Sequence, residues 1–180
     1  MHTRADGGFT LIEVLVAVLV LAIGVLGTAG AQLAAFQTRQ HTGLMSSGVH
    51  LAGSLADRMR ANAVQMNGGG APYTELDYDA LTDGAPSPPA PTCLGGATCS
   101  SAQMAAFDVY EITQAVHAGF PGGRIKVCRD TGGGALSWEC GGGAGAPLVI
   151  KLGWRTRGDN PDDTVAFVPF VAILAGGGVP

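Results

Sequence analysis

The chain has 180 residues, enough for one domain together with a separate apolar segment. It carries 10 Lys and Arg against 14 Asp and Glu, a net charge of −4, and its basic residues are scattered. A nucleic-acid-binding face needs clustered basic residues, so nucleic acid is not an expected partner. The glycine triplets lack the following Lys-Ser or Lys-Thr of a phosphate-binding loop, so we expect flexible loops there.

Residues 9–30 form an apolar run, interrupted only by the polar side chains of Thr10, Glu13 and Thr28. As a helix this run would extend about 33 Å, enough to cross the hydrocarbon core of a membrane. Arg4 precedes it and favours a cytoplasmic N-terminus, with the rest of the chain exported. The sequence therefore predicts a single membrane-spanning helix.

A cleaved secretory signal is the alternative, because "AGA" at residues 29–31 resembles a small-residue cleavage site. Three features disfavour it. The apolar run is longer than the core of such a signal, it contains the acidic residue Glu13, and its pattern continues beyond Ala31 as an amphipathic helix.

The continuation keeps apolar residues at helical spacing, with Gln40 and Gly48 at the two weak positions. "NGGGAP" at residues 67–72 then ends the helical pattern. We expect one helix from Phe9 to about Asn62 or Met66. The apolar stripe of this helix consists of Leu33, Phe36, Leu44, Leu51, Leu55 and Met59. From Leu44 onwards, the stripe should supply half of the hydrophobic core.

The next segment, up to residue 100, is rich in Pro, Gly and Ala and predicts a long surface loop. The four cysteines all follow the apolar run, and an even number in an exported domain favours two disulfides. Three pairings are possible; Cys93 with Cys99 and Cys128 with Cys140 are favoured because each pair closes a short loop. A zinc site is the alternative, but the spacings do not match the usual zinc knuckles.

The C-terminal part predicts a short helix and then strands. Ser100 or Ser101 can cap a helix that continues to about Ala118, and "PGG" at residues 121–123 ends it. Strands are expected at "RIKVCR", at "LSWEC" as its hairpin partner, at "PLVIKLGWRTR", and at "TVAFVPFVAIL" as an edge or bulged strand because of Pro169. Cys128 and Cys140 would then lie on neighbouring strands. The expected fold class is α+β, a long helix packed on a small antiparallel sheet.

No catalytic motif groups the Asp, His and Ser residues, so no enzyme, cofactor or metal site is expected. His41 and His50 do not share a helix face and are expected at the surface. "GDNPDD" at residues 158–163 is either a solvated acidic turn or a calcium site without the spacing of a known calcium loop.

Glu13 needs an explanation, because a charge within a membrane span is costly. It either stays at the interface near the positive helix end or has a dedicated partner. The stretch "GGFTLIEVLVAVLVLAIGVLG", residues 7–27, resembles the N-terminus of type IV prepilins and pseudopilins. The resemblance implies that a prepilin peptidase cuts after Gly8, that the new amine of Phe9 is methylated, and that Glu13 pairs with the terminal amine of a neighbouring subunit during filament assembly.

Three further stretches look like the PilV type of minor pilin, the type IV pilus modification protein: "LAGSLADRMRAN", "CSSAQMAAFDVYEI" and "FPGGRIKVC". The implied role is in pilus assembly, priming or modification. The implied partners are prepilin peptidase, other minor and major pilins, the inner-membrane pilus assembly machinery and membrane lipid. A type II secretion pseudopilin is the runner-up, and a membrane-anchored exported binding protein or enzyme is the rival from another class.

These inferences divide the chain into four parts. We expect a leader peptide at residues 1–8, a transmembrane or filament-core helix at 9–30, its amphipathic continuation at 31–66, and a globular head at 67–180. The expected location is the bacterial inner membrane, with a single pass, a cytoplasmic N-terminus and a periplasmic head, and then the pilus at the cell surface.

Overall fold

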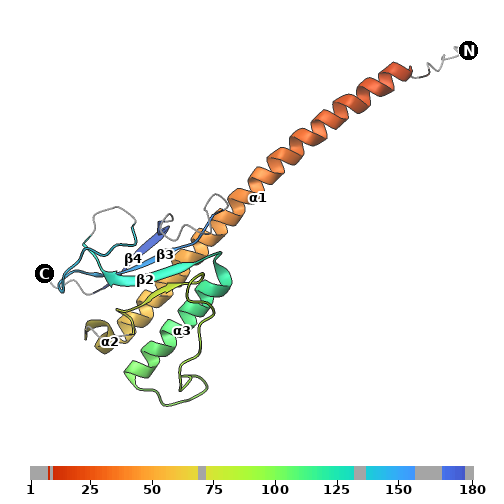
Figure 1. Ribbon diagram of the computed structural model, residues 1–180. Helices are drawn as coiled ribbons and strands as arrows, with labels where there is room; N and C mark the ends of the chain where they lie inside the picture. The colour runs from red at the N-terminus through yellow and green to blue at the C-terminus, as the bar shows by residue number, and fades with distance from the viewer. Residues whose placement is uncertain (1–7, 9, 69–71, 132–136, 157–167, 177–180) are drawn as a thin grey trace, which may run out of the picture. The chain divides into compact units, whose positions relative to one another are not determined.

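The computed structural model describes residues 8, 10–68, 72–131, 137–156 and 168–176. The chain divides into two compact units, one up to Gly43 and one from Leu44 onwards. The elements are α1 (Leu11–Ala61), α2 (Ala63–Asn67), β1 (Asp77–Asp79), α3 (Ser101–Gly119), β2 (Arg124–Arg129), β3 (Leu148–Gly153) and β4 (Val171–Gly176), as labelled in Figure 1.

The four strands form one antiparallel sheet in the order β1-β2-β3-β4. The pairs Val127–Ile150 and Ile125–Leu152 set the register of the two central strands, so their apolar side chains share one face. The second half of α1 and α3 pack their apolar side chains against the apolar residues of this sheet. The α+β fold class expected from the sequence is therefore confirmed.

The buried residues of α1 begin at Gly48 and end at Met59. Leu55 and Met59 are fully buried, and Leu44 is half-buried against the same core cluster. This confirms that the helix supplies core residues from Leu44 onwards. The stripe residues nearer the N-terminus differ: Leu33 and Phe36 are 60% and 62% exposed.

Gly48 is a position where the core requires a small residue. A Cβ atom there would lie 3.0 Å from the ring of Trp154 and 3.3 Å from Leu152. Trp154 is fully buried, and its ring lies 5.3 Å from that of Phe120 and 4.8 Å from that of Phe170. The tryptophan ring thus fills the space that a larger residue on α1 would need.

The helix α3 begins at the predicted place because Ser100 forms a capping box with Gln103. It ends before a turn in which Gly122 has a φ of +51°, and a Cβ atom there would lie 2.8 Å from Arg155. The glycine of this turn is therefore needed for both its backbone conformation and its small size. The predicted helix is confirmed.

A partly buried ionic network joins the end of α1 to α3. Nη1 of Arg58 donates to the carboxylates of Asp108, at 2.9 Å, and Glu111, at 2.5 Å. The hydroxyl of Tyr73 donates to the other oxygen of Asp108 at 2.5 Å. Burial and then the Asp108 hydrogen bond raise the pKa of Tyr73, and the hydrogen bond to Glu111 is the main cause that raises the pKa of Arg58. Each group therefore keeps its proton in this network.

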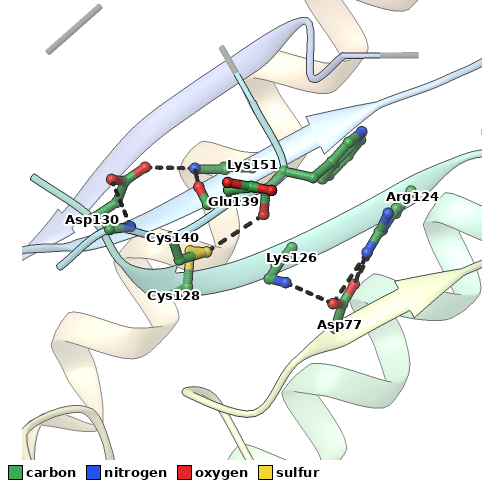
Figure 2. Close-up of a disulfide and its surroundings, with 10 residues drawn as sticks. Asp77, Arg124, Lys126, Cys128, Asp130, Glu139, Cys140 and Lys151 are labelled. Carbon is green, nitrogen blue, oxygen red and sulfur yellow. Dashed lines mark hydrogen bonds and ion pairs between the residues drawn. A yellow bond between two sulfur atoms is a disulfide. The ribbon is translucent and has the colours of Figure 1, made fainter. Parts of the chain in front are cut away.

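The sheet face opposite α1 is covered in part by the irregular segment 137–142. Lys151 on β3 is 3% exposed, and its Nζ contacts the Asp130 carboxylate and the Glu139 carbonyl oxygen, both at 2.5 Å (Figure 2). The Trp138 ring lies 4.7 Å below the guanidinium of Arg124. As a result, β3 is buried on both of its faces.

This arrangement corrects the prediction that "LSWEC" is the hairpin partner of residues 124–129. Residues 137–140 are not a strand, and β2 pairs instead with β1 and β3. Apolar and polar residues alternate in this stretch, but Trp138 packs over the face of the sheet and the stretch is not one of its strands. β1, which has only three residues, was not predicted, and Pro169 precedes the edge strand β4 instead of interrupting it.

Two disulfides close local loops, one between Cys93 and Cys99 and one between Cys128 and Cys140. They are the two pairs that short loop length favours. Cys128 lies on β2, but Cys140 lies in the covering segment, so the expectation that both are on neighbouring strands is wrong (Figure 2). This second disulfide ties the covering segment to the sheet.

We expect opposite effects from alanine at two glycines of α1. Gly53→Ala should raise the free energy of unfolding by about 0.5–1 kcal/mol, because a Cβ atom there meets nothing within 4 Å and alanine favours the helix. Gly48→Ala should lower it by about 1–3 kcal/mol through overpacking against Trp154. Chemical denaturation of the detergent-solubilised chain, followed by tryptophan fluorescence, measures both. Equal stabilisation by the two variants would contradict the tight contact.

Asp108→Ala should lower the free energy of unfolding by about 3 kcal/mol, because it removes the shared acceptor of Arg58 and Tyr73 from a buried site. Asp57→Ala is the matched control. Its ion pair with Arg60 is exposed, so its removal should cost less than about 1 kcal/mol. The same denaturation assay compares the two variants, and similar losses would show that the network adds nothing beyond a surface ion pair.

Candidate functional site

The predicted processing site, Gly8 and Phe9, precedes the N-terminal end of α1. Gly8 is exposed, and a Cβ atom on it would meet nothing within 4 Å. The helix begins at Leu11, and the carbonyl oxygen of Thr10 accepts hydrogen bonds from the backbone of Glu13 and Val14. Phe9 lies outside the described residues. The exposed Gly8 thus lies three residues before the start of a regular helix.

Glu13 lies in the first turn of this helix and is exposed. A negative charge is favourable there, because the N-terminal end of a helix carries a partial positive charge. The side chain borders a shallow groove on the helix surface, whose other residues are Val14, Ala17, Val18 and Leu21. Among the residues that the structure describes, no cation pairs with Glu13.

The surroundings of Glu13 are apolar. In the described part of the chain, one helix, α1, is both long enough and apolar enough to cross a membrane. Its large apolar side chains are 50% to 84% exposed between Leu11 and Leu26. Such a continuous apolar surface is unfavourable in water and requires lipid or other apolar helices as its surroundings. Glu13 is the one charged side chain on this surface between Leu11 and Leu26.

Two of the head stretches singled out in the sequence meet in space. Arg58, from "LAGSLADRMRAN", binds Asp108 and Glu111 of "CSSAQMAAFDVYEI". The side chain of Asn62 also donates to the carbonyl oxygen of Ser101 at 2.7 Å. The sequence analysis did not predict these partners of Arg58. Two acidic residues three positions apart on one helix face were the available signal.

The described residues contain no group of three or more His, Cys, Asp or Glu that could hold a metal ion. All four cysteines form disulfides, so none is available as a zinc thiolate. His41 and His50 are both exposed. The acidic turn at residues 158–163, for which calcium was the alternative, lies outside the described residues.

Two models of known protein families match the regions that contain the residues described above. The family model for the prokaryotic N-terminal methylation motif matches residues 3–29, which include Gly8, Phe9 and Glu13. The model described as type IV pilin Tt1218 matches residues 30–110, which include Arg58 and Asp108. No curated protein and no solved structure matches the chain.

The two matches are consecutive, and together they cover residues 3–110, which end within α3. They agree with the architecture, in which an N-terminal helix with an exposed apolar surface continues into a small α+β head. The chain is therefore a type IV prepilin-like protein.

Proposed function

We propose that the protein is a PilV-type minor pilin that acts in the assembly, priming or modification of a type IV pilus. The observation that carries the proposal is Glu13, a single exposed carboxylate in the first turn of a helix whose neighbouring side chains are apolar. The contact of Arg58 with Asp108 and Glu111 supports the PilV type, because it joins two of the stretches that resemble that group.

Processing acts first on the exposed backbone at Gly8. A prepilin peptidase hydrolyses the amide bond between Gly8 and Phe9, so that water supplies the hydroxyl of the leader's new carboxyl group and the nitrogen of Phe9 becomes a free amine. Methylation of this nitrogen leaves an amine that still carries a positive charge at neutral pH. Processing thus creates a cation four residues before Glu13.

The free amine and Glu13 then direct assembly. An unpaired carboxylate in apolar surroundings is costly, and an opposite charge offsets that cost most strongly where water is excluded. A subunit that places its amine against the Glu13 of its neighbour satisfies both groups, whereas a subunit in the wrong register leaves both unpaired. The apolar surface of α1 favours association, and the ion pair selects the register.

In this proposal residues 1–8 are the leader, residues 9–30 anchor the precursor, residues 31–66 continue the helix, and residues 67–180 form the head. The precursor spans the inner membrane once, with its N-terminus in the cytoplasm and its head in the periplasm, before it enters the pilus. Its partners are prepilin peptidase, other minor and major pilins, the assembly machinery and lipid. Its role is structural rather than catalytic.

The mature N-terminus tests the processing step. We expect mass spectrometry of the purified chain to find N-methyl-Phe9 at the start in cells with prepilin peptidase and the intact leader in cells without it. Gly8→Val should block cleavage without disturbing the fold, because its Cβ atom enters open space. An intact Met1 in both strains, or a mature chain that starts at Gln32, would contradict the proposal.

Assembly is tested by replacing the carboxylate. Glu13→Ala should leave the precursor inserted and cleaved but reduce its amount in sheared pili by about tenfold, the factor that corresponds to a loss of 1.4 kcal/mol. Thr28→Ala is the matched control, because the Thr28 hydroxyl bonds within its own helix to Val25. Immunoblots of pili and membranes measure both variants.

Normal incorporation of Glu13→Ala would remove the role proposed for this residue. A wild-type chain that is absent from pili, in cells whose type II secretion fails when the gene is deleted, would instead indicate a pseudopilin.

A further inference from the structure

A single cation lies in the long uncharged part of α1. Between Glu13 and Asp57, Arg39 is the one residue of the Asp, Glu, Lys and Arg types. Arg39 is exposed, and its side chain forms no ion pair with any residue that the structure describes. By contrast, Arg58 and Arg60, near the other end of α1, both bind carboxylates. The guanidinium of Arg39 is therefore open to a partner beyond the described residues.

The exposed apolar surface of α1 extends almost to this cation. Leu33 and Phe36 are 60% and 62% exposed, which is within the range of the large apolar side chains of residues 11–26. Such side chains are unfavourable in water and require lipid or other apolar groups around them. The part of the helix that requires apolar surroundings thus continues beyond Gly30 and ends at Phe36, three residues before Arg39.

The separation of Glu13 and Arg39 matches the thickness of a bilayer. The two residues are 26 positions apart on one continuous helix. At 1.5 Å per residue, this separation corresponds to about 39 Å along the helix axis. A hydrocarbon core is about 30 Å thick, and the polar headgroup regions bring the total to about 40–45 Å. When Glu13 lies in the inner headgroup region, Arg39 therefore lies in the outer one, with the apolar side chains between them in hydrocarbon.

We propose that Arg39 binds the phosphate group of a phospholipid in the outer leaflet and so fixes the depth of the precursor in the membrane. A guanidinium is always charged, and its planar set of N–H donors matches two phosphate oxygens. Side chains on a helix lean toward its N-terminal end, which is the membrane side of Arg39. The apolar stem of the side chain can thus pack on lipid tails while the guanidinium stays among the phosphates.

Phosphate suits Arg39 better than an acid from a second copy of the helix. A second α1 offers two carboxylates, Glu13 and Asp57. Glu13 is assigned above to the terminal amine, and Asp57 already pairs with Arg60 at 2.7 Å. Lipid phosphates, in contrast, surround the precursor at this depth before any other subunit binds. Entry into the pilus then requires that the bond between Arg39 and the phosphate breaks.

Thiol labelling of the precursor tests where the membrane span ends. Single cysteines at Leu33, Phe36 and Gly43 are exposed to a membrane-impermeant maleimide from the periplasmic side, in cells without prepilin peptidase. All three positions are exposed in the chain itself, and the native cysteines are in disulfides and do not react. Leu33→Cys should react at least about tenfold more slowly than Gly43→Cys, because the reactive thiolate is disfavoured in apolar surroundings. Equal rates would overturn the proposal.

Solid-state NMR tests the phosphate directly. The full chain is placed in vesicles of phosphatidylcholine and phosphatidylglycerol, and the coupling between arginine side-chain nitrogen and lipid phosphorus is measured. Arg39→Gln should reduce this coupling. Arg60→Gln is the matched control and should leave it unchanged, because Arg60 binds Asp57 and the carbonyl oxygen of Leu174. A coupling that Arg39→Gln does not change would overturn the phosphate contact.

Charge reversal tests the link between Arg39 and depth. In the Phe36→Cys background, Arg39→Glu should raise the labelling rate severalfold, because phosphate repels the carboxylate and the helix moves outward. Arg39→Lys keeps the positive charge and should keep the slow rate. An unchanged rate in Arg39→Glu would contradict the proposal. Slow labelling that appears only in cells with other pilins would assign Arg39 to a neighbouring subunit and would also overturn it.

The inference rests on the proposed function, in which the precursor spans the inner membrane, but the two can fail separately. A precursor in the membrane fraction whose Leu33→Cys variant reacts as fast as Gly43→Cys contradicts only the role of Arg39. A precursor that is absent from the membrane fraction contradicts both.

Discussion

The head depends on the burial of one face of α1 against the sheet. Gly48 lets the helix backbone lie close to Trp154, and Leu55 and Met59 complete the contact further along the helix. Because these residues belong to the same helix as the exposed apolar residues 11–26, one element has two apolar surfaces with different requirements. The first is satisfied within the chain, and the second needs lipid or other subunits.

The charged side chains of the head and of the exposed apolar part of α1 also differ. Within the described head, the buried charged side chains have partners inside the chain: Asp108 binds Arg58 and Tyr73, and Lys151 binds Asp130. These pairs offset the cost of removing charges from water. Glu13 is different, because no described residue pairs with it and its surroundings are apolar. The contrast supports a partner for Glu13 that comes from outside the chain.

The sequence predicted the elements whose pattern is local. The apolar run of α1, the Ser100 cap of α3 and the alternation in β2 and β3 each depend on neighbouring residues, and the α+β fold followed from them. It could not predict how separate segments meet. "LSWEC" alternates like a strand but covers the sheet, and the partners of Arg58 lie fifty residues away. For the site, the expected leader and the proposed role of Glu13 were inferred from a local motif, which does not depend on tertiary contacts, and both stay predictions.

The double covering of β3 has a consequence for how the head can change over time. This strand pairs with a neighbour on each edge, packs on α1 through Leu152 and is covered on the other face above Lys151. A substitution anywhere along it therefore meets packed atoms, and its amides can exchange with solvent only when much of the head opens. Residues 85–92 differ, because most of their side chains are exposed. The head is thus built around a strand that tolerates little change.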